Sequence, residues 1–311
     1  MLIKSNNFDS FMNMSDFIQF ELWKDCNVGC PFCFNRFQQS VDKLKMLDFV
    51  FDKLISDEVD NNIDFGLIGG EFFDNQLKDT TVKEKFYNLF PIIKEKINQG
   101  KIGRLLIATS LIFDRNKELV NFLKHLESLD LIKSTVLCTS YDSIYRFRND
   151  KMKTLWEDNM LFLKSNYPSL RLHTEIIITK KFMEDVLSGD FNILSFCEKY
   201  KTAVDYIDPM ADMKNYPKEK VMKDLPEFFP SVDLFISFLN YAYQNGLVDF
   251  STFLKMDIRS NHTYINYNGK LVLQDNRRLN DKWADGMLSF GFIDSDKKMR
   301  EVVDEFLDCM G

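Results

Sequence analysis

Short apolar runs alternate along the chain with segments in which apolar residues recur every three or four positions. The apolar runs predict strands over 17–23, 63–68, 104–109, 134–140, 170–179 and 204–208. The periodic segments predict helices over 40–60, 82–98, 119–126, 151–165 and 182–200. Pro91 should divide the second helix, Asp114 or Asn116 should cap the third, and Ser188-Gly189 should break the last. Strands that alternate with helices form βαβ units, so we expect a parallel α/β sheet, either doubly wound or barrel-like.

The pattern changes after Pro209, where the chain becomes polar and rich in proline. A loop or lid is predicted over 210–230, a helix over 231–245, a hairpin with an Asn-Gly turn over 262–273 and a last helix over 296–310. We therefore divide the chain into residues 1–210, which carry the strand–helix alternation, and a C-terminal extension over 211–311.

The composition is that of a globular protein with a sizeable core, at 311 residues with 45% hydrophobic and 28% charged. Forty basic residues against 47 acidic ones give a net charge of −7, which argues against binding nucleic acid or an anionic membrane. The first 15 residues lack the apolar core of a secretory signal, and no apolar run is long enough to span a bilayer. With six cysteines, three of them clustered, we expect a cytoplasmic protein without a disulfide framework.

Three cysteines lie close together after the first predicted strand, at Cys26, Cys30 and Cys33. Thiolates are soft ligands that suit iron–sulfur clusters or zinc. A structural zinc site usually needs four ligands, and no further Cys or His pair lies near in sequence. Three thiolates can instead hold three irons of a four-iron cluster and leave the fourth iron open, as a reactive metal site requires.

This Cys-x3-Cys-x2-Cys spacing, with the aromatic Phe32 before the last cysteine, resembles the signature of the radical S-adenosylmethionine (SAM) superfamily. The resemblance implies a partial (β/α)6 barrel of the TIM type, in which Cys26, Cys30 and Cys33 hold a [4Fe–4S] cluster whose open iron binds SAM. It further implies that the reduced cluster cleaves SAM to a 5′-deoxyadenosyl radical, with the electron supplied by a flavodoxin- or ferredoxin-like donor. Residues 211–311 would then close the barrel and contact the substrate as an α+β extension.

Gly69-Gly70-Glu71 follows the second predicted strand, at the edge where parallel α/β folds bind ligands. Glycine there lets the backbone approach a ligand closely. The alternative is that these residues form an ordinary turn and that Glu71 is a solvated acid. The position matches the superfamily's Gly-Gly-Glu, which contacts the amino group of SAM. By the same resemblance we include Thr109, at the end of the third strand, in the predicted SAM site.

The end of the fourth strand contributes Ser140 and Asp142, followed by Arg146 and Arg148. This matches loosely a Ser-x-Asp followed by an arginine that is common in the superfamily. A hydroxyl and a guanidinium suit the ribose and carboxylate of SAM. The alternative is that Asp142 is a turn residue and that both arginines are solvated.

The fifth strand alternates polar and apolar residues. Leu172, Ile176 and Ile178 share one face and should pack outward on helices, which leaves Arg171, His173 and Glu175 facing the lumen. We predict that His173 and Glu175 are catalytic and that Arg171 contacts the cofactor. The alternative is an ion-pair network in the lumen, together with Gln19 and Glu21.

The remaining cysteines, Cys138, Cys197 and Cys309, are interpreted as small buried hydrophobes. The stretch 267–274 resembles the hairpin that leads to an auxiliary-cluster cysteine in SPASM or twitch extensions, but Gln274 and Asp275 stand where that cysteine is expected. This resemblance favours a peptide or protein side chain as substrate. A small metabolite, a nucleoside or RNA, and a SAM-binding cluster protein without turnover remain as alternatives.

Overall fold

The computed structural model describes residues 16–31, 33, 42–55, 62–115, 117–142, 144–177, 179–207, 227, 234, 237–238, 240–241, 244–245, 261–265 and 271–274. Phe32, Ile178, the Asn268-Gly269 turn, Cys309 and the predicted last helix lie outside these residues.

One sheet organises the described chain. Its strands are β1 (Asp16–Glu21), β2 (Ile63–Ile68), β3 (Ile102–Ala108), β4 (Thr135–Tyr141), β5 (Arg171–Ile177), β6 (Thr202–Ile207), β7 (Asn261–Ile265) and β8 (Leu271–Gln274). The spatial order is β6-β5-β4-β3-β2-β1-β7-β8, and β1 to β6 are parallel. A doubly wound sheet would reverse direction at a switch point. Because β1 to β6 follow chain order without reversal, the fold is the partial barrel type, as predicted.

The C-terminal extension adds two strands to the same sheet. β7 pairs with β1 in parallel, and β8 pairs with β7 antiparallel, with His262 opposite Gln274. The predicted hairpin is therefore confirmed, and it lies beside the first strand. Residues 234, 237–238, 240–241 and 244 are helical, within the range predicted for a helix.

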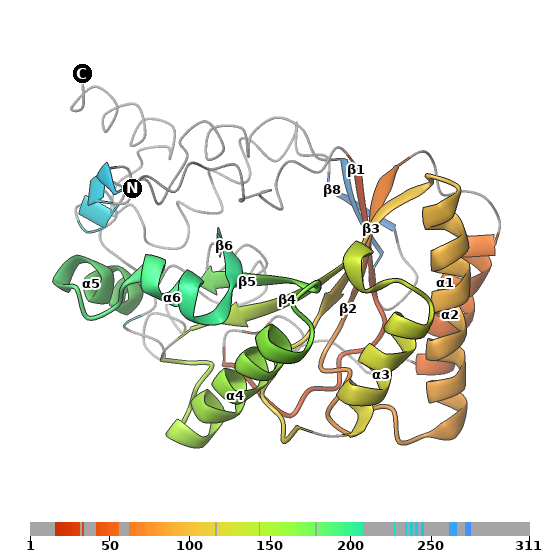
Figure 1. The fold of residues 1–311 in the computed structure, drawn as a ribbon, viewed down its shortest axis with the longest axis horizontal. Coiled ribbons are helices and arrows are strands. Elements are labelled where there is room, and N and C mark those ends of the chain that lie inside the picture. Colours follow the sequence, from red (N-terminus) through yellow and green to blue (C-terminus); the bar gives the residue numbers. More distant parts are fainter. Residues whose placement is uncertain are drawn as a thin grey trace.

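The helices follow one another in an arc around the strands (Figure 1). They are α1 (Lys43–Ile55), α2 (Thr80–Asn98), α3 (Lys117–Ser128), the short 3₁₀ helix η3 (Ile132–Ser134), α4 (Asp150–Asn166), α5 (Lys180–Ser188) and α6 (Ile193–Tyr200). Asp79, Asn149, Thr179 and Asn192 begin four of them, each accepting a backbone N–H of the first turn. Gly189, at φ +85°, ends α5 in the left-handed conformation, which confirms the predicted break between α5 and α6.

The predicted division at Pro91 is wrong, because α2 runs through this residue without a break. Proline lacks the N–H that would bond to the carbonyl four residues earlier, which is that of Tyr87. The imidazole of His125, on the neighbouring helix α3, forms a hydrogen bond with the backbone of Tyr87. A partner from another helix thus replaces the bond that Pro91 cannot make, and the sequence of α2 alone does not reveal it.

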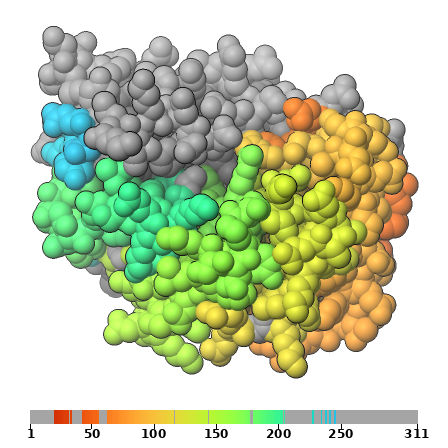
Figure 2. Space-filling view, viewed as in Figure 1, coloured from red at the N-terminus to blue at the C-terminus, as the bar shows by residue number. Residues whose placement is uncertain are grey.

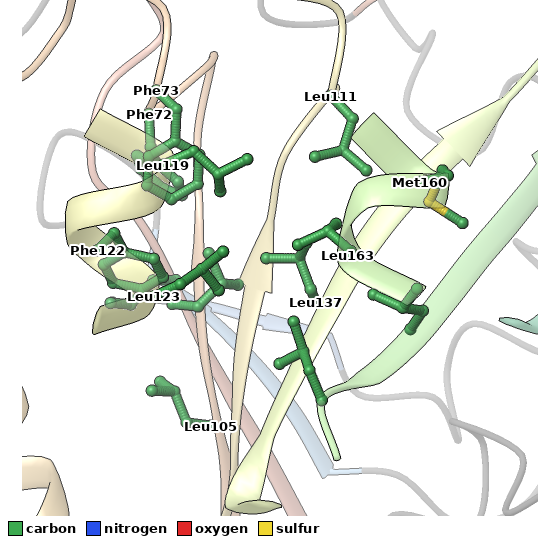
Figure 3. Packing of buried hydrophobic residues seen from close by; sticks show 14 of the residues in the cluster. Phe72, Phe73, Leu105, Leu111, Leu119, Phe122, Leu123, Leu137, Met160 and Leu163 are labelled. Atoms are coloured by element: carbon green, nitrogen blue, oxygen red, sulfur yellow. The ribbon is translucent and has the colours of Figure 1, made fainter. Parts of the chain in front are cut away.

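The two faces of the sheet belong to different environments. Leu105, Leu137 and Ile176 are buried in the main core together with apolar residues of the helices, including Phe122 and Leu163 (Figure 3). In the space-filling view the helices form a continuous outer surface over this core (Figure 2). On the opposite face, Leu106, Val136 and Cys138 form a separate small cluster.

The register of β4 and β5 settles which way the fifth strand faces. Leu172 and Ile176 belong to the main core, so they point outward. Arg171 and His173 are in register with Val136 and Cys138 of the lumen cluster, and residues in register share a face. The predicted orientation of the fifth strand is therefore confirmed for its described residues.

Candidate active site at the carboxyl edge of the sheet

The segment that enters the cysteine loop continues the pairing of β1 with β2. Leu22 N–H donates to the Ile68 carbonyl at 2.9 Å, Gly70 N–H to Trp23 at 2.6 Å, and Glu71 N–H to Asp25 at 2.8 Å. A Cβ on Gly69 would overlap the Trp23 carbonyl, and one on Gly70 would overlap the Asp25 carbonyl. The two glycines are therefore required for the backbone before Cys26 to lie against the end of β2.

The three thiols lie on the connector between β1 and α1, at the carboxyl edge of the sheet. Cys26 is exposed, Cys30 is buried and Cys33 is half-buried. Gly29 adopts φ +62°, and the Cys33 N–H donates to the Cys30 carbonyl at 3.1 Å, so a tight turn brings the second and third cysteines together.

The chemistry of this donor set fits an iron–sulfur cluster, because three thiols approach one edge on a single loop. Within the residues that the structure describes, no three His, Cys, Asp or Glu side chains are spaced to hold a single metal ion. In a four-iron cluster each of three thiolates binds a different iron, so the spacing required for a single ion does not apply to it.

The electrostatics of Cys26 connect the loop to two other predicted residues. Desolvation by the surrounding protein raises the pKa of the Cys26 thiol to about 11. The negative charges of Glu71 and Cys30 add to this rise, while the positive charge of Arg146 opposes it. Glu71 and Arg146 thus both lie within electrostatic reach of the cysteine loop.

Glu71 is completely buried, and its carboxylate holds the ends of β2 and β3 together. Its Oε1 accepts the Phe73 N–H at 2.9 Å and the Thr109 hydroxyl at 2.8 Å. Its Oε2 accepts the N–H and the hydroxyl of Ser110, at 2.6 and 2.5 Å. Burial raises the pKa of the Glu71 carboxyl, and these hydrogen bonds oppose the rise. Each carboxylate oxygen already accepts two hydrogen bonds, so a ligand would have to displace one of them to reach it.

Ser110 is a site residue that the sequence analysis missed. It is 6% exposed, and its neighbour Thr109 was predicted only through the superfamily resemblance. Two adjacent hydroxyl residues at the end of a buried strand were the available signal, but only the fold shows that they face Glu71.

Asp142 organises the turn after β4. Its carboxylate accepts the N–H groups of Ile144, Tyr145 and Arg146 at 3.3, 2.8 and 2.9 Å, and the side chain is 2% exposed. Burial raises its pKa, against the lowering effect of these hydrogen bonds and of Arg146. The turn-residue alternative for Asp142 is thus realised in the structure, and this turn positions Arg146.

The two arginines after Asp142 take different positions. Arg146 Nε is buried and has no hydrogen-bond partner in the described part of the chain. The guanidinium of Arg148 lies beside the cysteine loop, with both terminal nitrogens 3.8 Å from where a Cβ of Gly29 would be. Arg146 therefore offers an unused donor within electrostatic reach of Cys26, whereas the exposed Arg148 lies against Gly29 of the loop.

Ser140 and Glu175 meet on the lumen face near the same edge. They are in register on β4 and β5, and the Ser140 hydroxyl lies 3.4 Å from Glu175 Oε2. His173 is two residues earlier on β5 and 3% exposed. The fold therefore brings these three predicted residues onto one wall of the lumen.

Arg171 shares the lumen face but lies at the other end of β5, away from the carboxyl edge. It is the first residue of β5, four positions before Glu175, which corresponds to about 13 Å along a strand. The same amino-terminal half of the lumen face contains an ion pair between Asp64 and Arg104, with Nε–Oδ1 and Nη2–Oδ2 distances of 3.0 and 2.9 Å. An ion pair is thus present on the lumen face, but Asp64 and Arg104 on β2 and β3 are not members of the network that the sequence suggested, and the side chain of Gln19 lies outside the described set.

The other cysteines fit their predicted role where they are described. Cys138 is buried in the small lumen cluster, and Cys197 is half-buried on α6.

In the described residues, no helix combines the length and apolarity needed to cross a membrane.

Together, the fold and this edge define an α/β protein with a partial parallel barrel and a thiol-bearing loop at its carboxyl end. No protein-family model matches the chain, and no curated protein matches it. Among solved structures, the chain is similar to native anSMEcpe with bound AdoMet and Cp18Cys peptide, at 16% identity and a TM-score of 0.50. The match covers 93% of this chain and 80% of that one. At this identity the likeness supports the fold.

Proposed function

We propose that the protein is a radical SAM enzyme in which Cys26, Cys30 and Cys33 hold a [4Fe–4S] cluster and SAM fills the open iron position. The observation that carries the proposal is the cysteine triplet on the β1–α1 connector, at the carboxyl edge of a parallel barrel sheet. The likeness in fold to an AdoMet-bound protein supports it independently.

Bound cluster and SAM would supply reductive cleavage of SAM, whose 5′-deoxyadenosyl fragment takes a hydrogen atom from the substrate. The protein's own part is to bind, orient and exclude water. Arg146 would bind the SAM carboxylate with its unused Nε–H, because the Asp142 turn holds it within electrostatic reach of Cys26. Since the Glu71 oxygens are occupied, we assign the ammonium contact of Gly69-Gly70-Glu71 to the glycine carbonyls and give Glu71 the task of holding Thr109 and Ser110.

The substrate we propose is a peptide or protein side chain, in agreement with the peptide bound in the similar structure. Ser140, His173 and Glu175 form a polar lumen wall where the reacting part of a substrate would lie. A flavodoxin- or ferredoxin-like protein would supply the electron. A small metabolite or a nucleoside in the same place is the alternative.

Anaerobic purification and reconstitution test the cluster. The wild-type protein should contain about four iron and four sulfide per chain, as expected for one cubane held by three thiolates. Changing Cys26, Cys30 and Cys33 to Ala should remove the iron and the formation of 5′-deoxyadenosine under reductant. The matched control changes Cys138, Cys197 and Cys309 to Ser and should keep the iron; a triple Ala variant that kept it would refute the assignment.

Turnover of candidate substrates tests the substrate class. Peptides and nucleosides are incubated with the reconstituted enzyme, SAM and reductant, and mass spectrometry follows loss of one or two hydrogens. A mass change in a peptide coupled to 5′-deoxyadenosine formation supports the proposal. A mass change only in nucleosides would refute the peptide substrate and support a nucleoside substrate. SAM binding without any 5′-deoxyadenosine would indicate a protein without turnover.

A further inference from the structure

Lys43 is the first residue of α1, and its side chain reaches back to the segment before the cysteine loop. Its ammonium lies 2.8 Å from Asp25 Oδ2 and donates to Gln76 Oε1 at 2.6 Å. It also lies over the Trp23 ring, 5.4 Å from the centroid. The Lys43 side chain is only 22% exposed, so these contacts hold it against the protein.

The three contacts join segments on both sides of the cysteines. Asp25 directly precedes Cys26, and Lys43 begins the helix that follows the loop, so their ion pair closes the segment 26–42 at its base. Gln76 belongs to the segment after Gly69-Gly70-Glu71. Closing a loop at its base removes conformations that would separate its ligands.

Helix stability does not explain a lysine at this position. A positive charge at a helix N-terminus opposes the helix dipole, and the first turn of α1 contains no acidic residue. The cap is supplied instead by Asp42, whose Oδ1 accepts the N–H groups of Leu44 and Lys45 at 3.0 and 3.4 Å. The contacts of Lys43 with the loop base are therefore its evident contribution.

A second ion pair of α1 offers a comparison. Asp48 pairs with Lys85 of α2, and both side chains are more exposed than Lys43, at 55% and 36%. This pair joins two helices, and in the described part of the chain it has no ion pair or hydrogen bond with the cysteine loop. Asp48–Lys85 is therefore an ion pair of the same two residue types as Asp25–Lys43, but it does not lie at the base of the cysteine loop.

We propose that Lys43 is a positioning residue of the cysteine loop: its ammonium fastens the loop base to Trp23, Asp25 and Gln76 and so keeps the three thiols at one edge. The expected effect of Lys43 on iron retention rests on the proposed function. The effect of Lys43 on the order of the loop does not, because the loop can be measured in the protein without iron. Lys43→Met should loosen the loop, and Lys43→Arg should restore it, because a guanidinium can meet the same acceptors.

Two measurements on the 311-residue chain test the proposal. Hydrogen–deuterium exchange of the cluster-free protein reports the order of residues 26–33. Transfer of iron to a chelator reports how firmly the reconstituted protein holds it. Lys43→Met should accelerate both by at least about fivefold, as expected for the loss of charge-assisted contacts. Lys43→Arg and the control Lys85→Met should stay within about twofold of wild type, because one keeps the contacts and the other lies away from the loop.

Unchanged exchange and iron transfer in Lys43→Met would overturn the inference, as would an equal change in Lys85→Met. If circular dichroism shows that Lys43→Met does not fold, Asp25→Asn takes its place, because it removes the charge and keeps the carbonyl that Glu71 N–H contacts. A wild-type protein that binds no iron would refute the proposed function, whereas the exchange comparison would still decide whether Lys43 orders the loop.

Discussion

The two faces of the sheet differ, although the same strands form both. On the outer face, Leu105 and Leu137 are at most 1% exposed and belong to a core that continues into the helices (Figure 3). On the lumen face, the separate cluster contains Leu106, Val136 and Cys138 among the described residues, and they lie among charged neighbours. The outer face therefore supplies most of the hydrophobic burial that stabilises the fold.

The lumen face itself differs from end to end. Its amino-terminal half contains the ion pair of Asp64 with Arg104, while its carboxyl end leads to the cysteine loop and to Ser140 and Glu175. We call the amino-terminal half the lower lumen and the carboxyl end the upper lumen. Substitutions on the outer face and in the lower lumen should reduce stability, and those in the lower lumen should leave the chemistry intact. Substitutions in the upper lumen should impair the chemistry.

The largest expected effect is on the outer face, and β3 provides a matched pair. Leu105 and Leu106 are adjacent and buried, at 0% and 2% exposure, but point to opposite faces. Leu105→Ala should lower the free energy of unfolding by an amount near the top of about 2–5 kcal/mol, and Leu106→Ala by an amount near the bottom of that range, because the lumen cluster is small. Urea unfolding measures both, and an equal or larger loss for Leu106→Ala would contradict the comparison.

The outer face was also the more predictable of the two. Apolar periodicity located the strands and helices, because burial against helices imposes the pattern directly. It could not anticipate the unbroken α2, since the partner of the Tyr87 carbonyl comes from His125 on another helix.

The site was predictable in its residues and less so in their contacts. The spacing of the cysteines and the alternation of β5 are local features of the sequence. What Gly70 and Glu71 contact is not local: the glycine accommodates the Asp25 carbonyl, and the acid binds Ser110, 39 residues away. Such roles depend on strand neighbours that the sequence leaves open.

The second effect concerns the lower lumen. Asp64→Asn removes one charge of a bidentate pair whose side chains are 9% and 23% exposed. Because Arg104 keeps some solvent, we expect a loss of about 1–3 kcal/mol, less than for a fully buried pair. A double-mutant cycle with Arg104→Met measures the coupling by urea unfolding. At a temperature where the variant is folded, 5′-deoxyadenosine formation should persist; its loss would place this pair with the chemistry.

The third effect is on the reactivity of Cys26 at the mouth of the lumen. With a folded pKa of about 11 against the ordinary 9.0, the thiol carries little thiolate at pH 8. Because the thiolate is the form that reacts with iodoacetamide, we expect cluster-free protein to be alkylated at Cys26 at least about tenfold more slowly than a free cysteine. Peptide mass spectrometry over a pH series measures this, and a rate equal to that of free cysteine at pH 8 would contradict it.

The same shift has a consequence for stability. A folded pKa above the unfolded one means that the folded protein keeps the proton between pH 9.0 and about 11. The contribution of Cys26 to stability is therefore fully present below pH 9.0 and is lost as the pH rises toward 11. Cys26→Ser should flatten this part of the pH–stability curve.

The smallest effect is at the upper lumen, where Glu175 lies beside Ser140 on the wall that would face the substrate. Glu175→Gln preserves size and removes the charge, so the fold and the iron content should be retained. Formation of 5′-deoxyadenosine should fall at least about tenfold, which corresponds to about 1.4 kcal/mol in the activation free energy. The matched control is Glu157→Gln on α4, where Glu157 pairs with Lys199 at 3.5 Å on the outer side, and it should change the rate by less than about twofold. Wild-type turnover in Glu175→Gln would make the polar wall of β5 structural filling, and the upper lumen would then resemble the lower lumen in function as well as in charge.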